Sequence, residues 1–238
     1  MAAMLAALRY NLKIIAPTLV WTGTLVGVLS ALILFFQFRS RDRFDMVAAG
    51  SLGEEFIPVI AAFFAGGAMD AELKRGAHEL LRSRLRPLWH TVAYRLVVAV
   101  ALALGVGTIL LGALYLGIRV FPLGMVLLAA VPPCTALAVV SLWTRVRLGN
   151  AFIGYVVAVG AWVANTLTGQ MARTTGIALN PLLTFSSYTD RLQAISAGEL
   201  DTTPYVDWWW VSKIALVLTA ALVFWSLTRR IEHLTEGD

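Results

Sequence analysis

Long apolar stretches separated by short polar segments make up most of the chain. Six of them reach or approach the roughly 20 apolar residues that a membrane-spanning helix needs. They cover approximately residues 15–36, 50–69, 92–118, 123–143, 151–171 and 208–227. The second is the weakest, because its apolar run, Phe56–Met69, becomes a full span only if the helix begins nearer Ala48. The pattern predicts an all-α membrane protein, a six-helix transmembrane bundle that forms a single domain over residues 1–238.

Composition agrees with a membrane location. Of the 238 residues, 59% are hydrophobic and 14% are charged, whereas a soluble domain has about 25% charged residues. The net charge of +5 therefore concerns topology and contact with membrane lipid, and we expect no nucleic-acid partner. The single cysteine, Cys134, excludes an internal disulfide and a cysteine-built metal site. Its apolar surroundings favour a buried structural thiol.

Basic residues beside the spans predict the orientation, because cytoplasmic loops are enriched in Lys and Arg. With both termini in the cytoplasm, 12 of the 19 basic residues lie inside and 7 lie outside, Lys213 among the latter. The cluster Arg39–Arg43 also falls outside, in a loop that contains Asp42, Asp45, Glu54 and Glu55. We expect a multi-pass protein of the cell (plasma) membrane with both termini cytoplasmic.

Several features of other membrane-protein classes are missing from the sequence. It has no G-x-x-x-x-G-K-[ST] phosphate loop. We also place no Asp, Glu, Lys or Arg in the middle of a span, where ion-coupled carriers usually need one. The pair Glu54-Glu55 is similar to the glutamates of CAAX-processing metalloproteases, but Pro58 and Val59 follow in place of an arginine. We expect no enzyme activity, no catalytic residue, no metal site and no cofactor in this chain.

A charged segment, residues 70–90, interrupts the apolar pattern between the second and third spans. Its leucines and alanines recur mostly at three- and four-residue steps, and charges occupy the other side. This spacing predicts a basic amphipathic helix that ends near Pro87. Such a helix can lie against anionic lipid of the inner leaflet or dock a cytoplasmic partner. The residues alone leave both alternatives open.

The same segment resembles a motif of type-2 permeases in ATP-binding-cassette (ABC) exporters. That family reads E-x-x-x-G-T-x-E-x-L just after its second span, followed by a proline, basic residues, and Lys or Arg entering the third span. Glu72, Gly76 and Glu79 match at their spacing, and Ala77 stands where Thr is usual. Arg95 takes the basic entry position. The six-span plan and the chain length extend the resemblance to the whole chain as architecture.

The resemblance implies that the segment is a cytoplasmic coupling helix between spans 2 and 3, seated in a groove of an ATPase. Glu72 and Glu79 fall on nearly the same helix face and can pair with neighbouring arginines. The plainer alternative is a solvated surface ion pair of little energetic value. The implied partners are two ABC ATPase subunits, which bind ATP and Mg, and a second permease subunit, identical or related. The implied docking residues are Glu72, Arg75, Gly76, Glu79, Leu80, Arg82, Arg84 and Arg86.

Small residues form stripes on the first and fifth spans. Such stripes let another helix approach closely, and the resemblance implies that these two helices form the permease dimer interface. Packing within one subunit is an equally open alternative. The residues are Gly23, Gly27 and Ala31 in the first span and Gly154 and Ala158 in the fifth.

The outer end of the fifth span is its most polar part. Its hydroxyl and amide side chains can line a substrate path, although hydrogen bonds between helices are the alternative. The residues are Asn165, Thr166, Thr168 and Gln170. An outer loop, residues 172–207, follows, and its spacing predicts a short amphipathic helix through Phe185, Tyr188, Leu192 and Ile195.

Together these features predict the transmembrane subunit of an ATP-driven ABC exporter that does not itself hydrolyse ATP. Because the predicted spans contain no central charge to neutralise an ionic substrate, we expect an amphipathic or hydrophobic substrate. The alternative is a non-transport membrane scaffold whose basic cytoplasmic loop recruits a protein partner or anionic lipid.

Overall fold

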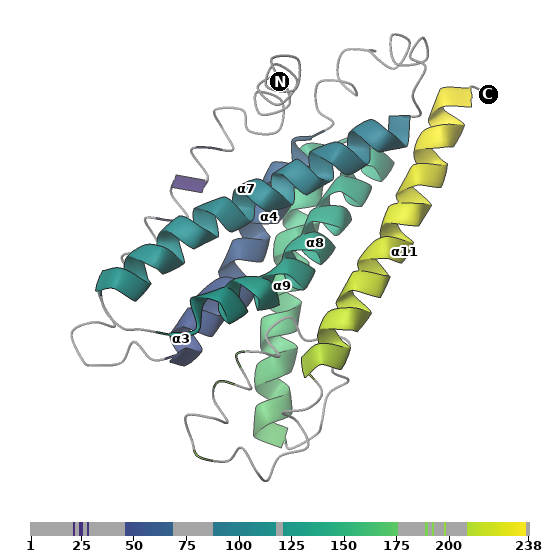
Figure 1. Ribbon diagram of the computed structural model, residues 1–238. Helices are drawn as coiled ribbons and strands as arrows, with labels where there is room; N and C mark the ends of the chain where they lie inside the picture. The colour runs from purple at the N-terminus through teal and green to yellow at the C-terminus, as the bar shows by residue number, and fades with distance from the viewer. Residues whose placement is uncertain are drawn as a thin grey trace, which may run out of the picture.

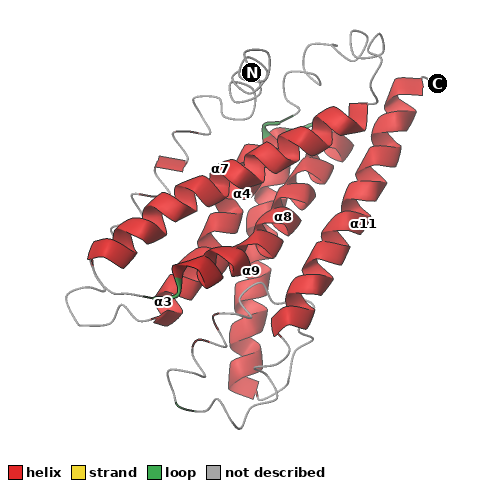
Figure 2. Cartoon of the chain, viewed as in Figure 1, coloured by secondary structure: helices red, strands yellow, loops and turns green. Residues whose placement is uncertain are grey.

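The computed structural model describes residues 46–68, 88–117, 121–175 and 209–236, together with Trp21, Thr24, Leu25, Val28, Thr189, Leu192 and Gly198. Every element in these ranges is helical, and they contain no strand (Figure 2). The helices are α3 (Met46–Ser51), the π-helical turn η1 (Leu52–Phe56), α4 (Ile57–Gly66), α7 (Leu88–Gly117), α8 (Leu123–Leu148), α9 (Ala151–Thr175) and α11 (Trp209–Glu236).

Four helices in this described part are long and apolar enough to cross a membrane, namely Val47–Gly66, Trp89–Gly117, Leu123–Leu148 and Trp210–Ile231. The chain is therefore a helical membrane protein, as its apolar pattern predicts. In α9 the apolar stretch among the described residues, Phe152–Asn165, is shorter. The predicted first span, 15–36, lies almost wholly outside the described residues, and the number of six spans stays a prediction.

The second span begins earlier than its apolar run suggests. Helices α3, η1 and α4 follow one another without a break from Met46 to Gly66. The wide turn η1 stands just before Pro58, whose ring would clash with the carbonyl of Glu54 in a regular α-helix and whose nitrogen has no hydrogen to donate to it. A π turn relieves this conflict without ending the helix.

Helix α8 lies at the centre of the bundle and contacts α4, α7, α9 and α11 (Figure 1). Its buried residues include several small ones, which allow close approach: Ala129, Ala130, Ala136, Ala138 and Ser141. Cys134 is fully buried on this helix, so the prediction of a buried thiol is confirmed.

A tight turn joins α8 to α9. Gly149 adopts the left-handed conformation with φ of 71°, and its N–H donates to the carbonyl of Arg145 at 2.9 Å. This is a common way to end a helix. The Phe152 N–H then donates to Asn150 Oδ1 at 2.9 Å, so Asn150 caps the start of α9. The two helices are therefore antiparallel neighbours.

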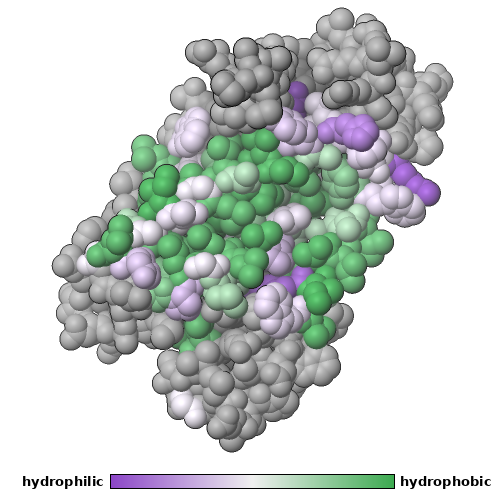
Figure 3. Space-filling model, viewed as in Figure 1, coloured by the Kyte–Doolittle hydropathy of each residue, from purple (hydrophilic) through white to green (hydrophobic). Residues whose placement is uncertain are grey.

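The helices carry large apolar side chains on their outer faces, as lipid contact requires. In the view of Figure 3 hydrophobic residues cover most of the described helix surface, and strongly hydrophilic residues lie mainly toward the upper end. There α7 begins and α8 and α11 end (Figure 1). We call this end the basic end, because it contains Arg95, Arg145, Arg147, Arg229 and Arg230.

The small-residue stripe of α9 packs inside the subunit. A Cβ atom on Gly154 would lie 2.7 Å from the backbone oxygen of Ser141 in α8, and Ala158 is buried together with Ala62 and Leu137. These two positions therefore serve packing within one chain, one of the two alternatives that the sequence left open. The matching stripe, Gly23, Gly27 and Ala31, lies outside the described residues.

Alanine substitutions at two glycines of α9 distinguish the effect of close packing on stability from the effect of helix propensity. Gly160 lies on the same helix with nothing within 4 Å of an added Cβ. We expect Gly160→Ala to stabilise the protein by up to about 1 kcal/mol through helix propensity. Gly154→Ala should instead destabilise it by about 1–3 kcal/mol, because a backbone oxygen cannot move aside. Unfolding in detergent micelles measures both, and equal effects would contradict this packing.

Candidate functional site

A buried ion pair joins η1 to α11. The Lys213 ammonium forms a salt bridge with Oε1 of Glu54, and the two residues are 3% and 0% exposed. The other carboxylate oxygen, Oε2, accepts two hydrogen bonds from Thr189, one from its N–H at 2.7 Å and one from its hydroxyl at 2.8 Å. Three parts of the chain that are distant in sequence therefore meet at one carboxylate.

Small residues on the same helical run make room for this arrangement. A Cβ atom on Gly50 would lie 2.9 Å from Oγ1 of Thr189. A Cβ atom on Gly53 would lie 2.6 Å from a methyl group of Val126 in α8. A larger residue at Gly50 would push away Thr189, and one at Gly53 would push away Val126 of α8. The glycines therefore help to seat Glu54 between its partners.

The chemistry of this cluster is that of an anchor. A charge buried in an apolar medium is tolerated only when it is paired and hydrogen-bonded, and both oxygens of Glu54 have such partners. Among the described residues no group of three or more His, Cys, Asp or Glu could hold a metal ion. We therefore interpret the cluster as a contact that fixes α11 and residue 189 to the second span.

The position of this pair corrects one expectation, the placement of Glu54. Glu54 was expected in the outer loop with Arg39–Arg43, but it is fully buried inside the helical run Val47–Gly66. Lys213 lies near the start of the predicted span 208–227, and the structure buries its side chain within Trp210–Ile231. Both charges thus lie within membrane-length helices. The sequence did contain a signal for this pairing. One acidic and one basic residue lie near the predicted outer ends of two spans, and Pro58 follows Glu54 by four residues.

A second buried cation ties α4 to α7 at the basic end. Arg95 is 3% exposed, and its Nη1 donates to the carbonyl oxygen of Ala68 at 2.7 Å. Ala68 follows the last turn of α4, where carbonyl groups have no partner within the helix. We call this contact the Arg95–Ala68 clamp. It joins the two helices between which residues 69–87 run.

The remaining predicted site residues divide into two groups. All of the docking residues between Glu72 and Arg86 lie outside the described residues. Of the predicted path residues, Asn165 is 6% exposed and thus buried in the bundle, while the others lie along α9 and their side chains are not described. Thr189 and Leu192 of the outer loop are buried, so these two residues pack on the protein.

Comparisons with known proteins identify no relative, since no protein-family model, no curated protein and no solved structure matches the chain.

Removing one member of the ion pair should destabilise the protein strongly, and removing both charges should destabilise it much less. We expect Glu54→Gln or Lys213→Met alone to lower the free energy of unfolding by about 3–5 kcal/mol, because each leaves an uncompensated buried charge. The double variant should lose considerably less, which a double-mutant cycle in detergent measures.

The neighbouring carboxylate supplies the matched control. Glu55 is only partly buried, and we expect Glu55→Gln to have a smaller effect than Glu54→Gln. Strictly additive losses for the Glu54 and Lys213 variants would show that the two charges do not interact.

Proposed function

We propose that this chain is the membrane subunit of an ATP-driven ABC exporter, with energy supplied by separate ATPase subunits. The motif Glu72, Gly76 and Glu79 suggests the class. The observation that carries the proposal is the Arg95–Ala68 clamp. Its arginine stands at the basic entry position of the motif, and it fixes the helices on both sides of the charged segment to each other.

The position of the Arg95–Ala68 clamp, at both ends of the charged segment, is suited to a coupling helix. A segment that passes motion from an ATPase into the membrane acts as a lever only if its two attachment points move together. Arg95 and Ala68 are both buried, and a hydrogen bond from a charged donor is stronger than one between neutral groups. Residues 70–87 would then transmit force to α4 and α7 as one unit.

The orientation belongs to the same proposal. The basic end contains arginines of α7, α8 and α11, so the positive-inside rule favours placing it in the cytoplasm. The segment 70–87 connects elements at this end and would meet a cytoplasmic ATPase. Six spans with both termini cytoplasmic, a plasma-membrane location, and a second permease subunit complete the proposed assembly.

The buried charges also bear on the cargo. Glu54 and Lys213 neutralise each other, and Arg95 is engaged with a carbonyl. These three groups are therefore committed to partners within the chain and do not offer a free charge to an ionic substrate. We therefore propose an amphipathic or hydrophobic substrate, such as a lipid or lipopeptide.

Docking through the charged segment is testable in the native complex. We expect the tagged chain to co-purify from its own membranes with an ATPase subunit. Replacing Glu72 and Glu79 with alanine should reduce that association roughly tenfold or more, because truncating one partner of an interfacial charge contact costs about 2–5 kcal/mol. Immunoblotting of the recovered subunit and its ATP hydrolysis rate give the result.

Two acidic residues near the end of α11 provide the control. Glu232 and Glu236 also lie at the basic end, and we expect their replacement with alanine to leave the ATPase bound. Normal assembly of the Glu72 and Glu79 variant, or the absence of any ATPase partner, would favour the membrane-scaffold alternative.

Substrate class is tested by stimulation of ATP hydrolysis. In the reconstituted complex we expect amphipathic lipids or lipopeptides to raise turnover, and small sugars and inorganic ions to leave it unchanged, because the buried charges Glu54, Lys213 and Arg95 already have partners within the chain. Strong stimulation by a sugar or an inorganic ion alone would overturn the proposed cargo.

A further inference from the structure

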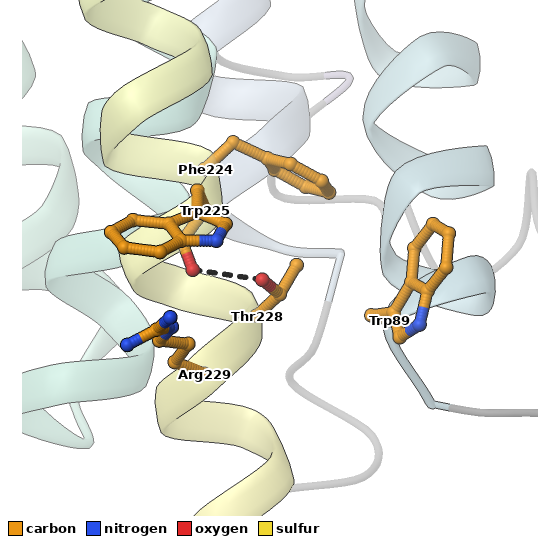
Figure 4. Close-up of a pocket in the computed structure, with 5 residues that line it drawn as sticks. All are labelled: Trp89, Phe224, Trp225, Thr228 and Arg229. Atoms are coloured by element: carbon orange, nitrogen blue, oxygen red, sulfur yellow. Dashed lines mark hydrogen bonds between the residues drawn. The ribbon is translucent and has the colours of Figure 1, made fainter.

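An open cleft lies between the start of α7 and the last turns of α11, at the basic end (Figure 4). It has a volume of about 380 Å³ and is lined by Trp89, Phe224, Trp225, Thr228 and Arg229. Ligand sites commonly combine such apolar and aromatic walls with a few polar groups. Among the described residues that line it, the one charged group is the guanidinium of Arg229.

The guanidinium of Arg229 is held in a defined position. Its Cζ lies 3.9 Å from the centre of the Trp225 ring, which is a close cation–π contact. Stacking uses the face of the guanidinium and leaves the N–H donors at its edge, in the planar fork that matches a phosphate group. The Thr228 hydroxyl is directed elsewhere, since it donates to the Trp225 carbonyl at 2.8 Å.

An exposed apolar ridge runs along α11 away from the cleft. Leu218, Leu222 and Trp225 are 60%, 66% and 55% exposed. Their spacing of four and three residues places them on one helix face, and Arg229 continues the same ridge one turn later. A single molecule with a long apolar tail and an anionic head could therefore contact the ridge and the guanidinium together.

We propose that this cleft is a binding site for an anionic phospholipid. Its phosphate would meet Arg229, the glycerol region would lie among the aromatic residues, and an acyl chain would follow Leu222 and Leu218. Tryptophan and arginine commonly lie at the headgroup level of a bilayer. A second arginine at this end, Arg147, also lies over a tryptophan ring, that of Trp143, at 5.3 Å.

The charged segment of this chain is a poorer match for the cleft. Residues 70–87 carry five basic and three acidic side chains, so their net charge has the same sign as Arg229. A neutral lipid would satisfy the ridge but would bring no net charge to the guanidinium. An anionic lipid satisfies both features, and this choice does not depend on the proposed transport function.

Lipid selectivity can be measured on the intact protein. We would reconstitute the full chain into nanodiscs with equal amounts of phosphatidylglycerol and phosphatidylcholine, and count the retained lipids by native mass spectrometry. We expect preferential retention of phosphatidylglycerol. Arg229→Gln should reduce that preference about tenfold, because the guanidinium attracts the net negative charge of phosphatidylglycerol, which the zwitterionic phosphatidylcholine lacks.

Arg230→Gln is the matched control, because Arg230 has the same charge, adjoins Arg229 and is exposed, but does not line the cleft. We expect it to keep the preference nearly intact. Trp225→Leu should weaken binding less than Arg229→Gln, since it removes the stacking platform but keeps apolar volume. Equal losses for the two arginine variants would indicate diffuse charge attraction, and no preference in the unmodified protein would show that the cleft does not select the headgroup. Either result overturns the proposal.

Discussion

The buried contact between Glu54 and Lys213 sets the arrangement of the described structure. In a bilayer no water is available to solvate a charge, so an ionised group inside the bundle must find its partners within the protein. Glu54 finds them in α11 and at Thr189. The packing of α11 against the central helix and the position of residue 189 are therefore linked to one carboxylate in the second span. Loss of this pairing would leave a charge that the apolar surroundings cannot accommodate.

The second span is held by charged groups near both of its ends. Glu54 lies close to its beginning, and the carbonyl of Ala68, just beyond its end, accepts a hydrogen bond from Arg95. These positions are 14 residues apart, which corresponds to about 20 Å of helix. Between them the helix packs on α8 through buried residues such as Ile57 and Phe64. The span is thus fixed to α11 near one end and to α7 at the other, with the central helix along its length.

Apolar length and periodicity predicted the helical membrane class and the approximate extents of α7, α8 and α11, because lipid contact requires long uninterrupted apolar runs. They could not predict the buried ion pair. A hydropathy pattern places Glu54 and Lys213 at the ends of spans, because burying either charge alone in the membrane is unfavourable. The two can be buried together only because they face each other in the folded bundle. The stripe of Gly154 and Ala158 shows a similar limit, because small residues indicate a close approach but do not identify which helix approaches. Arg95 was singled out as a basic entry position, which stays a prediction, and its partner in the structure is a backbone carbonyl, which carries no sequence signal.

These contacts constrain how a force on the segment 70–87 would reach the membrane under the proposed function. Bending the second span away from α11 would separate Glu54 from Lys213, at a cost of about 3–5 kcal/mol for a broken buried pair. Sliding α4 past α7 would break the charge-assisted bond of Arg95 as well. A displacement that carries α4, α7 and α11 together breaks neither contact. The lower-energy response is therefore a rigid-body movement of these helices. The helices would then move as a unit relative to other elements. The contacts that change would be those of apolar side chains in lipid, and no charge would become exposed.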